Sequence, residues 1–309
     1  MTPEILAREA ATVHDRIRRR LAERRGMLLA HNYQAGNVQA AADRTGDSLE
    51  LARWAAETDA EVIVFAGVTF MAESAKLLAP EKTVLLPVAE AGCSLADTIT
   101  ADEVRGLRRR YPRAAVVAYV NSTAEVKAEA DICCTSANAV QVVNALPHDE
   151  IVCVPDRNLA AWVARHTAKR VVAWPGSCCV HDHIRTAHLD EARRRHPDAR
   201  VLVHPECRPE VCAAADAVLS TSQMVRYVAR DDAPAYVIGT EVGMLVRLRQ
   251  DHPNRAFHPL AESMVCRTMK MTGLGDVLDA LERDRHLVDV PRNVASRARR
   301  AVAEMLRIR

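Results

Sequence analysis

The chain has 309 residues, of which 49% are hydrophobic, so it is long enough to bury two or three separate cores. Its formal net charge is +2 with 27% charged residues, which argues against a basic nucleic-acid-binding arm and an acidic tail. The charged N-terminus, Met1 to Arg25, lacks the apolar centre of a secretion signal, and no apolar run approaches the roughly 18 residues of a membrane span. We therefore expect a cytoplasmic protein with no membrane segment and no nucleic-acid partner.

Short apolar runs alternate with helical patterns along the chain, which predicts βαβ units and parallel sheets. Each run ends in a small or polar residue and leads into a predicted helix. The predicted strands are Met27 to Ala30, Val62 to Phe65, Val116 to Tyr119, Ile151 to Val154, Val201 to Val203 and Tyr236 to Ile238.

Several features recur at a nearly constant period, which indicates a triplicated unit. A cysteine closes each unit, at Cys93, Cys178 and Cys266, with spacings of 85 and 88 residues. Four further series have almost the same spacing: polar strand ends (His31, Tyr119, His204), acidic helix ends (Asp43, Asp131, Asp216), hydroxyls before helices (Ser48, Ser136, Ser222) and second strand ends (Gly67, Pro155, Thr240).

The repeat predicts an α/β protein made of three similar α/β/α domains around a pseudo-threefold axis, with a central active site. Ligands of open parallel sheets bind at the carboxyl ends of the strands, which each domain would present to the centre. We expect a discontinuous first domain of residues 1–92 and 267–309, a second of 93–177 and a third of 178–266.

The nine cysteines do not fit a disulfide framework or a C-x-x-C motif, because their number is odd and that spacing is absent. Three thiolates in the same phase of a repeat would instead converge on a metal. Such a set suits a zinc site with a fourth ligand, a mononuclear iron site, or an iron–sulfur cluster with one open iron. Cys153 lies inside an apolar strand and is expected in a core.

Eleven short segments, in order along nearly the whole chain, resemble the quinolinate synthase family. They are His31 to Gln34, Gly46 to Ala52, Gly67 to Glu73, Ala91 to Asp97, Tyr119 to Ser122, Cys134 to Ala139, Trp174 to His181, His204 to Cys207, Ser220 to Ser222, Ile238 to Glu241 and Cys266 to Lys270.

This resemblance implies a [4Fe-4S] cluster held by Cys93, Cys178 and Cys266, with an open iron acting as a Lewis acid. It also implies condensation of iminoaspartate with dihydroxyacetone phosphate to quinolinate, for NAD biosynthesis, with iminoaspartate supplied by an aspartate oxidase or dehydrogenase. The C-x-x-C that some members carry around the last ligand is absent here.

The resemblance further implies that the polar strand ends supply the acid–base groups and substrate anchors. Glu206 is the expected general base, with His204, Tyr33 and His31 as further catalytic groups. The expected substrate-binding residues are His31, Ser48, Tyr119, Asn121, Ser136, His204, Glu206 and Thr221. The remaining histidines, including His181, are expected at the surface or behind the site.

Ser48, Ser136, Thr221 and Ser222 each stand just before a predicted helix. Hydroxyls at that position serve either as ordinary N-caps or, with the free backbone N–H groups, as anion sites. The sequence leaves both interpretations open.

Two other functions remain as alternatives. An aconitase-type hydro-lyase also uses a three-cysteine cluster, but those proteins pair a lone cysteine with a C-x-x-C. A non-catalytic iron–sulfur sensor would need an output module, and no basic recognition helix is visible.

Overall fold

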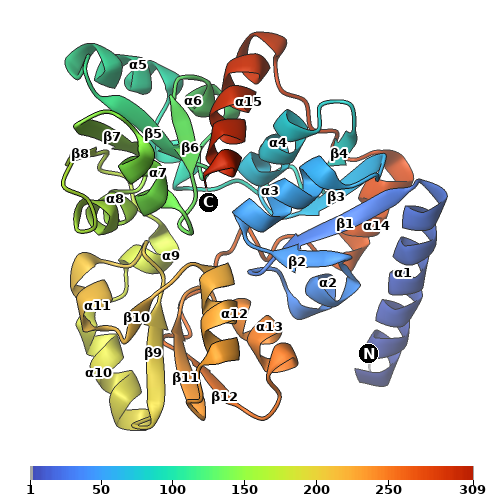
Figure 1. Ribbon diagram of the computed structural model, residues 1–309. Coiled ribbons are helices and arrows are strands. Elements are labelled where there is room, and N and C mark those ends of the chain that lie inside the picture. Colours follow the sequence, from blue (N-terminus) through green and yellow to red (C-terminus); the bar gives the residue numbers. More distant parts are fainter. Residues whose placement is uncertain (1–2, 309) are drawn as a thin grey trace. The chain divides into compact units, whose positions relative to one another are not determined.

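Three four-stranded sheets, in which every strand pair is parallel, form the framework of the chain (Figure 1). The computed structural model describes the backbone of residues 3–308 and the side chains of residues 12–308. The strand orders are β2-β1-β3-β4, β6-β5-β7-β8 and β10-β9-β11-β12, which is the same order three times. This confirms the α/β class and the three similar segments, while the pseudo-threefold axis and central site stay predictions.

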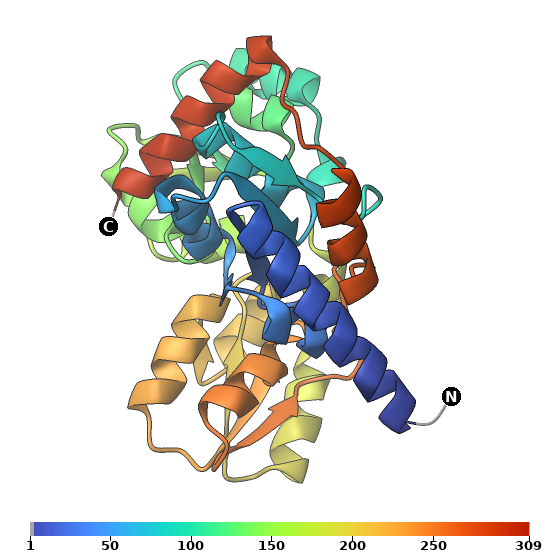
Figure 2. The ribbon, with the colours of Figure 1, turned by 90° about the vertical axis from the view of Figure 1, so that its right-hand side faces the viewer.

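The first sheet is built on two buried strands that are apolar along almost their whole length. Its helix α1 packs along α14, which comes from far along the chain (Figure 2). The elements are α1 (Pro3–Glu23), β1 (Gly26–His31), α2 (Gly36–Ala41), β2 (Arg44–Gly46), α3 (Ser48–Glu57), β3 (Val62–Ala66), α4 (Thr69–Leu78), β4 (Thr83–Leu85) and α14 (Leu274–Arg283).

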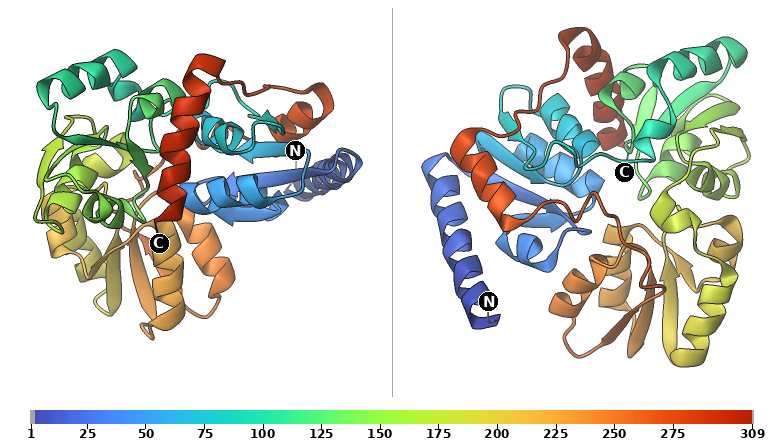
Figure 3. Two further views of the ribbon diagram at one scale, coloured as in Figure 1. Left: turned by 45° about the horizontal axis from the view of Figure 1, so that its top comes forward. Right: turned by 180° about the vertical axis from the view of Figure 1, so that it is seen from behind.

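The second sheet repeats this plan and is covered in part by the C-terminal helix. That helix, α15, packs against α6 and β6 (Figure 3). The elements are a short 3₁₀ helix η1 (Ala96–Thr98), α5 (Ala101–Arg110), β5 (Ala115–Tyr119), α6 (Ala124–Ala128), β6 (Ile132–Cys134), α7 (Ala139–Ala145), β7 (Glu150–Val154), α8 (Arg157–Ala164), β8 (Arg170–Ala173) and α15 (Arg292–Arg307).

The third sheet has two apolar cores, one on each face. Val201 and Val237 point into one core, and Leu202 and Ile238 into the other, as the alternation of side chains along a strand requires. The elements are α9 (Cys179–Asp182), α10 (Thr186–Arg195), β9 (Ala199–Val203), α11 (Pro209–Ala214), β10 (Ala217–Val218), α12 (Thr221–Arg230), β11 (Ala235–Gly239), α13 (Met244–Asp251) and β12 (Ala256–Pro259).

By its internal packing the chain divides into two compact units. The first comprises Met1–Cys93 and Arg267–Pro291, and the second comprises Ser94–Cys266 and Arg292–Arg309. The sequence assigned everything after Cys266 to the first domain, and for α15 this differs from the structure. Its apolar face, which includes Val294 and Val302, is buried within the second unit. An amphipathic pattern predicts that a face is buried, but not which element covers it.

One detail repeats in all three sheets and supports the triplication. An aspartate that follows the first helix after the central strand accepts a hydrogen bond from a backbone N–H near the start of that strand. The bonds run from Leu28 N to Asp43 (2.8 Å), from Val116 N to Asp131 (2.8 Å) and from Val201 N to Asp216 (2.6 Å). Each aspartate also pairs with an arginine of the helix preceding the strand, Arg18, Arg108 or Arg193.

None of the described helices combines the length and the apolar composition that crossing a bilayer would require.

Candidate active site

The three cysteines of the repeat lie in equivalent loops, each after the fourth strand of its sheet. In every copy the N–H of a residue shortly after the third strand donates to the carbonyl of the residue two positions before the cysteine. These bonds are Thr69 N to Ala91 O (2.9 Å), Arg157 N to Gly176 O (2.8 Å) and Val242 N to Met264 O (2.9 Å). We call this hydrogen bond the backbone tie. It fixes the chain just before Cys93, Cys178 and Cys266 in the same way.

These three cysteines differ from most of the others in exposure. Cys93, Cys178 and Cys266 are half-buried, and no disulfide occurs among the described cysteines. Burial instead raises the pKa of the thiol to about 12 at Cys133, Cys153 and Cys212, and well above its usual value at Cys134 and Cys207. The five buried side chains stay protonated thiols, which are poor metal ligands. Cys153 lies in a core, as predicted.

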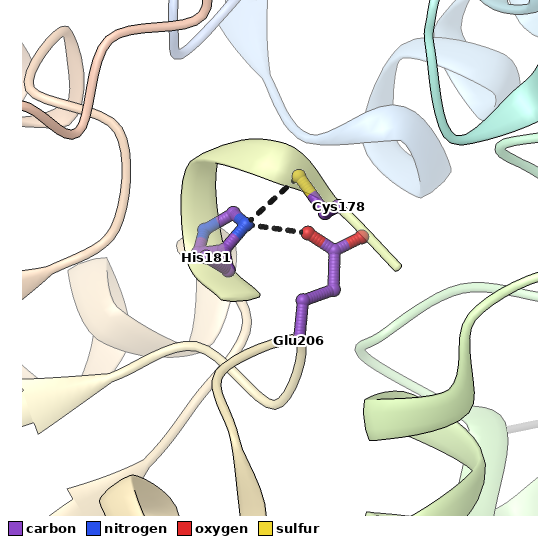
Figure 4. Close-up of side chains that lie close together, drawn as sticks. All are labelled: Cys178, His181 and Glu206. Atoms are coloured by element: carbon purple, nitrogen blue, oxygen red, sulfur yellow. Dashed lines mark hydrogen bonds and ion pairs between the residues drawn. The ribbon is translucent and has the colours of Figure 1, made fainter. Parts of the chain in front are cut away.

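Glu206 lies at the centre of a polar cluster in the second unit. It follows β9, is 3% exposed and accepts a hydrogen bond from His181, whose Nδ1 lies 2.7 Å away (Figure 4). Tyr119 donates to its carboxylate, and Asn121 Nδ2 approaches Oε1 at 3.5 Å. The backbone carbonyl of Glu206 accepts from Asn158 Nδ2 at 3.0 Å. The second and third sheets thus both supply groups to this cluster, and three predicted residues meet in it.

The surroundings of Glu206 hold its carboxylate ionised. Burial by itself would raise the pKa, but the imidazoles of His181 and His204, with hydrogen bonds from His181 and Tyr119, lower the pKa of Glu206 to about 2. The nearby Asp156 has the opposite tendency. Its burial and the charge of Glu206 raise the pKa of Asp156 to about 8, against the effect of bonds from backbone N–H groups.

His204 is buried as a neutral ring. Burial is the main cause that lowers the pKa of His204, to about 3. Its Nδ1 accepts from the backbone N–H of Glu206 at 3.3 Å, so the proton of the neutral ring lies on Nε2. Nε2 then donates to the hydroxyl of Ser136 at 3.1 Å. This contact brings together two of the predicted substrate-binding residues.

The sequence left His181 either at the surface or behind the site, and the structure buries it beside Cys178 and Glu206. It is 1% exposed, not at the surface, and its Nε2 lies 2.9 Å from Thr240 Oγ1. Its Nδ1 lies 3.2 Å from Cys178 Sγ as well as next to Glu206. The available signal was its position three residues after Cys178, which is the N-cap of the short helix α9 that carries His181.

Cys178, His181 and Glu206 also form a group whose ligand atoms lie within 4.8 Å of one another. The 2.7 Å between His181 Nδ1 and Glu206 Oε2 is a hydrogen-bond distance. Two ligands about 2.1 Å from one tetrahedral zinc would lie about 3.4 Å apart. The arrangement therefore favours a hydrogen-bonded pair beside Cys178 over a mononuclear zinc site.

The first unit carries its own predicted residues, His31, Tyr33, Ser48 and Cys93. His31 is 4% exposed at the end of β1, and its Nδ1 accepts from the backbone N–H of Tyr33 at 3.2 Å. The two rings meet edge to face at 4.5 Å. His204 and Glu206 repeat this two-residue bond, which identifies the pairs as equivalent. That these four residues join the Glu206 cluster stays a prediction.

The predicted helix starts are shifted by one residue at two places. Ser48 and Thr221 are the first residues of α3 and α12, and the N-caps are Asp47 and Ser220. Both caps form capping boxes, which satisfy two backbone donors at once. Ser48 and Thr221 therefore do not serve as the caps of these helices.

Comparison with known proteins adds independent evidence. The family model described as "Quinolinate synthetase A protein" matches residues 15–307. A protein of Dehalococcoides mccartyi (strain ATCC BAA-2266 / KCTC 15142 / 195) named quinolinate synthase is 54% identical over 93% of this chain and 95% of its own length. Proteins with the same name from Methanoregula boonei and Geobacter metallireducens are 51% and 48% identical, over 96% and 97% of this chain and 99% of each relative.

Proposed function

The chain belongs to the quinolinate synthetase A protein family, and on this premise we propose that it is a quinolinate synthase. The reaction we propose condenses iminoaspartate with dihydroxyacetone phosphate to quinolinate, with release of phosphate and water. The observation that carries the proposal is the backbone tie repeated before Cys93, Cys178 and Cys266, because it gives three distant cysteines one common geometry.

We propose that these three cysteines hold a [4Fe-4S] cluster. The donor set fits such a group, since the three side chains are half-buried while five other cysteines are buried as thiols. When bound, a cluster with three cysteine ligands supplies an iron with an open coordination position that acts as a Lewis acid.

Glu206 is the proposed general base. Its carboxylate is buried and is held by His181 and Tyr119, which fixes the position of this proton acceptor. His204 acts beside it as a neutral ring that fixes the hydroxyl of Ser136, so that Ser136 is oriented to donate its own proton to a substrate oxygen.

The other proposed residues anchor the substrates or carry protons. Asn121 Oδ1 is a buried oxygen without a hydrogen-bond partner among the described residues, so it is an available acceptor for a substrate. Tyr119, at the end of strand β5, is proposed to contact the substrate through its hydroxyl. His31 and Tyr33 are proposed as proton carriers, and His31, Ser48 and Thr221 as substrate contacts from their strand and helix ends.

The cellular role that we propose follows from this chemistry. Quinolinate would enter NAD biosynthesis in the cytoplasm, and iminoaspartate would come from an aspartate oxidase or dehydrogenase, since the imine hydrolyses readily in water.

The direct test is to purify the protein without oxygen, reconstitute it with iron and sulfide, and supply iminoaspartate with dihydroxyacetone phosphate. We expect quinolinate, measured by chromatography against a standard. An intact cluster that yields no quinolinate would contradict the proposed reaction, whereas a missing cluster would contradict the proposed cofactor.

Single cysteine variants test the ligand set. Cys93→Ser, Cys178→Ser and Cys266→Ser should each abolish the brown chromophore, because each removes one of three thiolates. The matched variants Cys133→Ser and Cys153→Ser remove buried thiols and should keep it. Iron and sulfide analysis checks the result, and a stable cluster in Cys266→Ser would overturn the assignment.

A second candidate is a zinc enzyme that uses Cys178, His181 and Glu206, because these residues already lie together. Metal analysis of the protein as isolated distinguishes the two. Stoichiometric zinc that depends on His181, without sulfide, would favour the zinc enzyme.

A further inference from the structure

Two of the three cysteine loops share a contact in addition to the backbone tie. The backbone N–H of Cys178 donates to Asp156 Oδ2 at 3.1 Å, and the N–H of Cys266 donates to Glu241 Oε1 at 3.2 Å. Asp156 and Glu241 are 2% and 0% exposed. A buried carboxylate therefore touches the main chain of each of these cysteines directly.

Asp156 and Glu241 are equivalent positions of the repeat. They lie 85 residues apart, each two residues after the end of the third strand of its sheet. The first copy has Val68 at this position, which has no side-chain acceptor. The carboxylate is thus a feature of the second and third copies, whereas the backbone tie is common to all three.

Each carboxylate is itself anchored at the start of the segment that follows the strand. The other oxygen of Asp156 accepts from Leu159 N at 2.7 Å and caps α8. The other oxygen of Glu241 accepts from Gly243 N at 2.7 Å, just before α13. In each copy the carboxylate therefore joins a rigid strand–helix junction to the cysteine loop, which lies outside the strands of the sheet.

This bridge has a physical consequence for the cysteine. Loops are mobile unless hydrogen bonds hold their backbone groups in place. Two bonds, one from the cysteine N–H and one to the carbonyl two residues earlier, leave little freedom to the Cα atom of Cys178 or Cys266.

We infer that Asp156 and Glu241 are positioning residues that hold the main chain of Cys178 and Cys266 in the conformation that binds the cluster. Neither residue is a ligand. The inference rests on the proposed function, since it takes these cysteines as cluster ligands. In the second and third copies a side-chain carboxylate holds the cysteine N–H. In the first copy the side chain of Val68 cannot do so.

The test compares cluster retention in Asp156→Ser and Glu241→Gln with the wild type. Serine keeps one oxygen for capping α8 but leaves none for Cys178 N. Glutamine has one acceptor oxygen for two N–H groups, and Glu241→Leu has none, so the effect should increase from glutamine to leucine. After anaerobic reconstitution, the visible absorbance and the bound iron and sulfide are followed during exposure to an iron chelator.

We expect the cluster to be lost faster, or held more weakly, by roughly 10- to 100-fold, as is typical when a group supporting a metal ligand is removed. The matched controls are Asp131→Asn and Asp216→Asn. They also remove a carboxylate that accepts from a backbone N–H in the second or third sheet, but near the opposite end of the central strand. These controls should retain the cluster like the wild type.

Denaturant unfolding of the cluster-free proteins separates positioning from general loss of stability. If Asp156→Ser and Asp131→Asn are destabilised to a similar extent and only the former releases iron, the positioning role holds. Equal retention in all variants would refute it. A wild-type protein that takes up no cluster would instead refute the proposed function.

Discussion

Gly176 shows how a single residue sets the path of a cysteine loop. A Cβ atom on Gly176 would overlap Thr98 Oγ1 and lie 2.5 Å from the carbonyl oxygen of Pro155. The loop before Cys178 therefore passes so close to the end of the third strand that no side chain fits. This close approach is what allows Gly176 O to accept from Arg157 N.

Gly176→Ala should displace this loop and destabilise the protein by about 1–3 kcal/mol, because the added methyl group meets backbone and cannot be accommodated by a rotamer change. Urea unfolding measures the loss, and iron content after reconstitution reports on Cys178. Gly106→Ala is the matched control. Its Cβ would meet only the end of Arg109 at 3.8 Å inside α5, where alanine is favourable. Equal stability of the two variants would contradict this account.

At the residue scale, the repeat marked the polar residues at the strand ends, whose catalytic and binding roles stay predictions. His204, Glu206, Tyr119 and Asn121 were expected from strand ends in phase, and the structure brings these four together. The sequence could not choose between a surface position and one behind the site for His181, because its equivalents in the other copies, Ala96 and Met269, are apolar and no series pointed to it. The four-residue helix α9 is also too short to show a hydrophobic period.

At the scale of elements, the six buried strands were predicted and the six edge or outer strands were not. The predicted ones are mostly apolar because helices cover both faces. The missed ones have only two to four residues, and several of them, such as β2, β8 and β10, are partly exposed. Such segments form strands because the neighbouring strand has unpaired backbone groups to bond with. Their own composition gives little indication that they are strands.

The packing of β12 against its neighbours predicts a pH effect on stability. His258 of β12 stacks on His196 with ring centroids 3.6 Å apart, and Arg249 of α13 lies nearby. Burial first, then His196 and Arg249, lower the pKa of His258 below 6.5. The unfolded chain therefore binds more protons than the folded one as pH falls below 6.5, and stability must fall with it.

His258→Gln should reduce this dependence. We expect the urea midpoint of the wild type to drop between about pH 8 and about pH 5.5 by more than that of the variant. His148→Gln serves as a control on a histidine outside this stack. An identical pH profile for the wild type and His258→Gln would contradict the predicted contribution.

For the molecule as a whole, the C-terminal helix shows why domain boundaries are hard to read from sequence. The chain leaves the second unit after Cys266, forms α14 in the first unit and returns at Arg292 with α15. Both helices are amphipathic, so each must pack its apolar face against another element. Neither helix sequence indicates which element that is. The repeat predicted three sheets correctly, and it could not predict where a helix outside the repeat docks.

Met305→Ala tests how much α15 contributes to the second unit. Met305 is 0% exposed, and its carbonyl accepts from Asn138 in the cap of α7. Removing the side chain should cost about 2–5 kcal/mol, as for other fully buried methionines. Arg300→Ala on the exposed face of α15 is the control and should change the free energy of unfolding by less than about 0.5 kcal/mol. A similar small change in both variants would mean that α15 is dispensable.

The recurring loop geometry also bears on how such a chain could arise. In the proposed ligand set, one copy of roughly 85 residues contributes one cysteine, so separate copies would have to associate as a trimer to supply three, and dilution would oppose that association. When the copies are fused in one chain, their association becomes intramolecular, and it depends on the length of the linkers instead of the protein concentration. A fused chain also allows each copy to carry a different residue at one position, as Val68, Asp156 and Glu241 do.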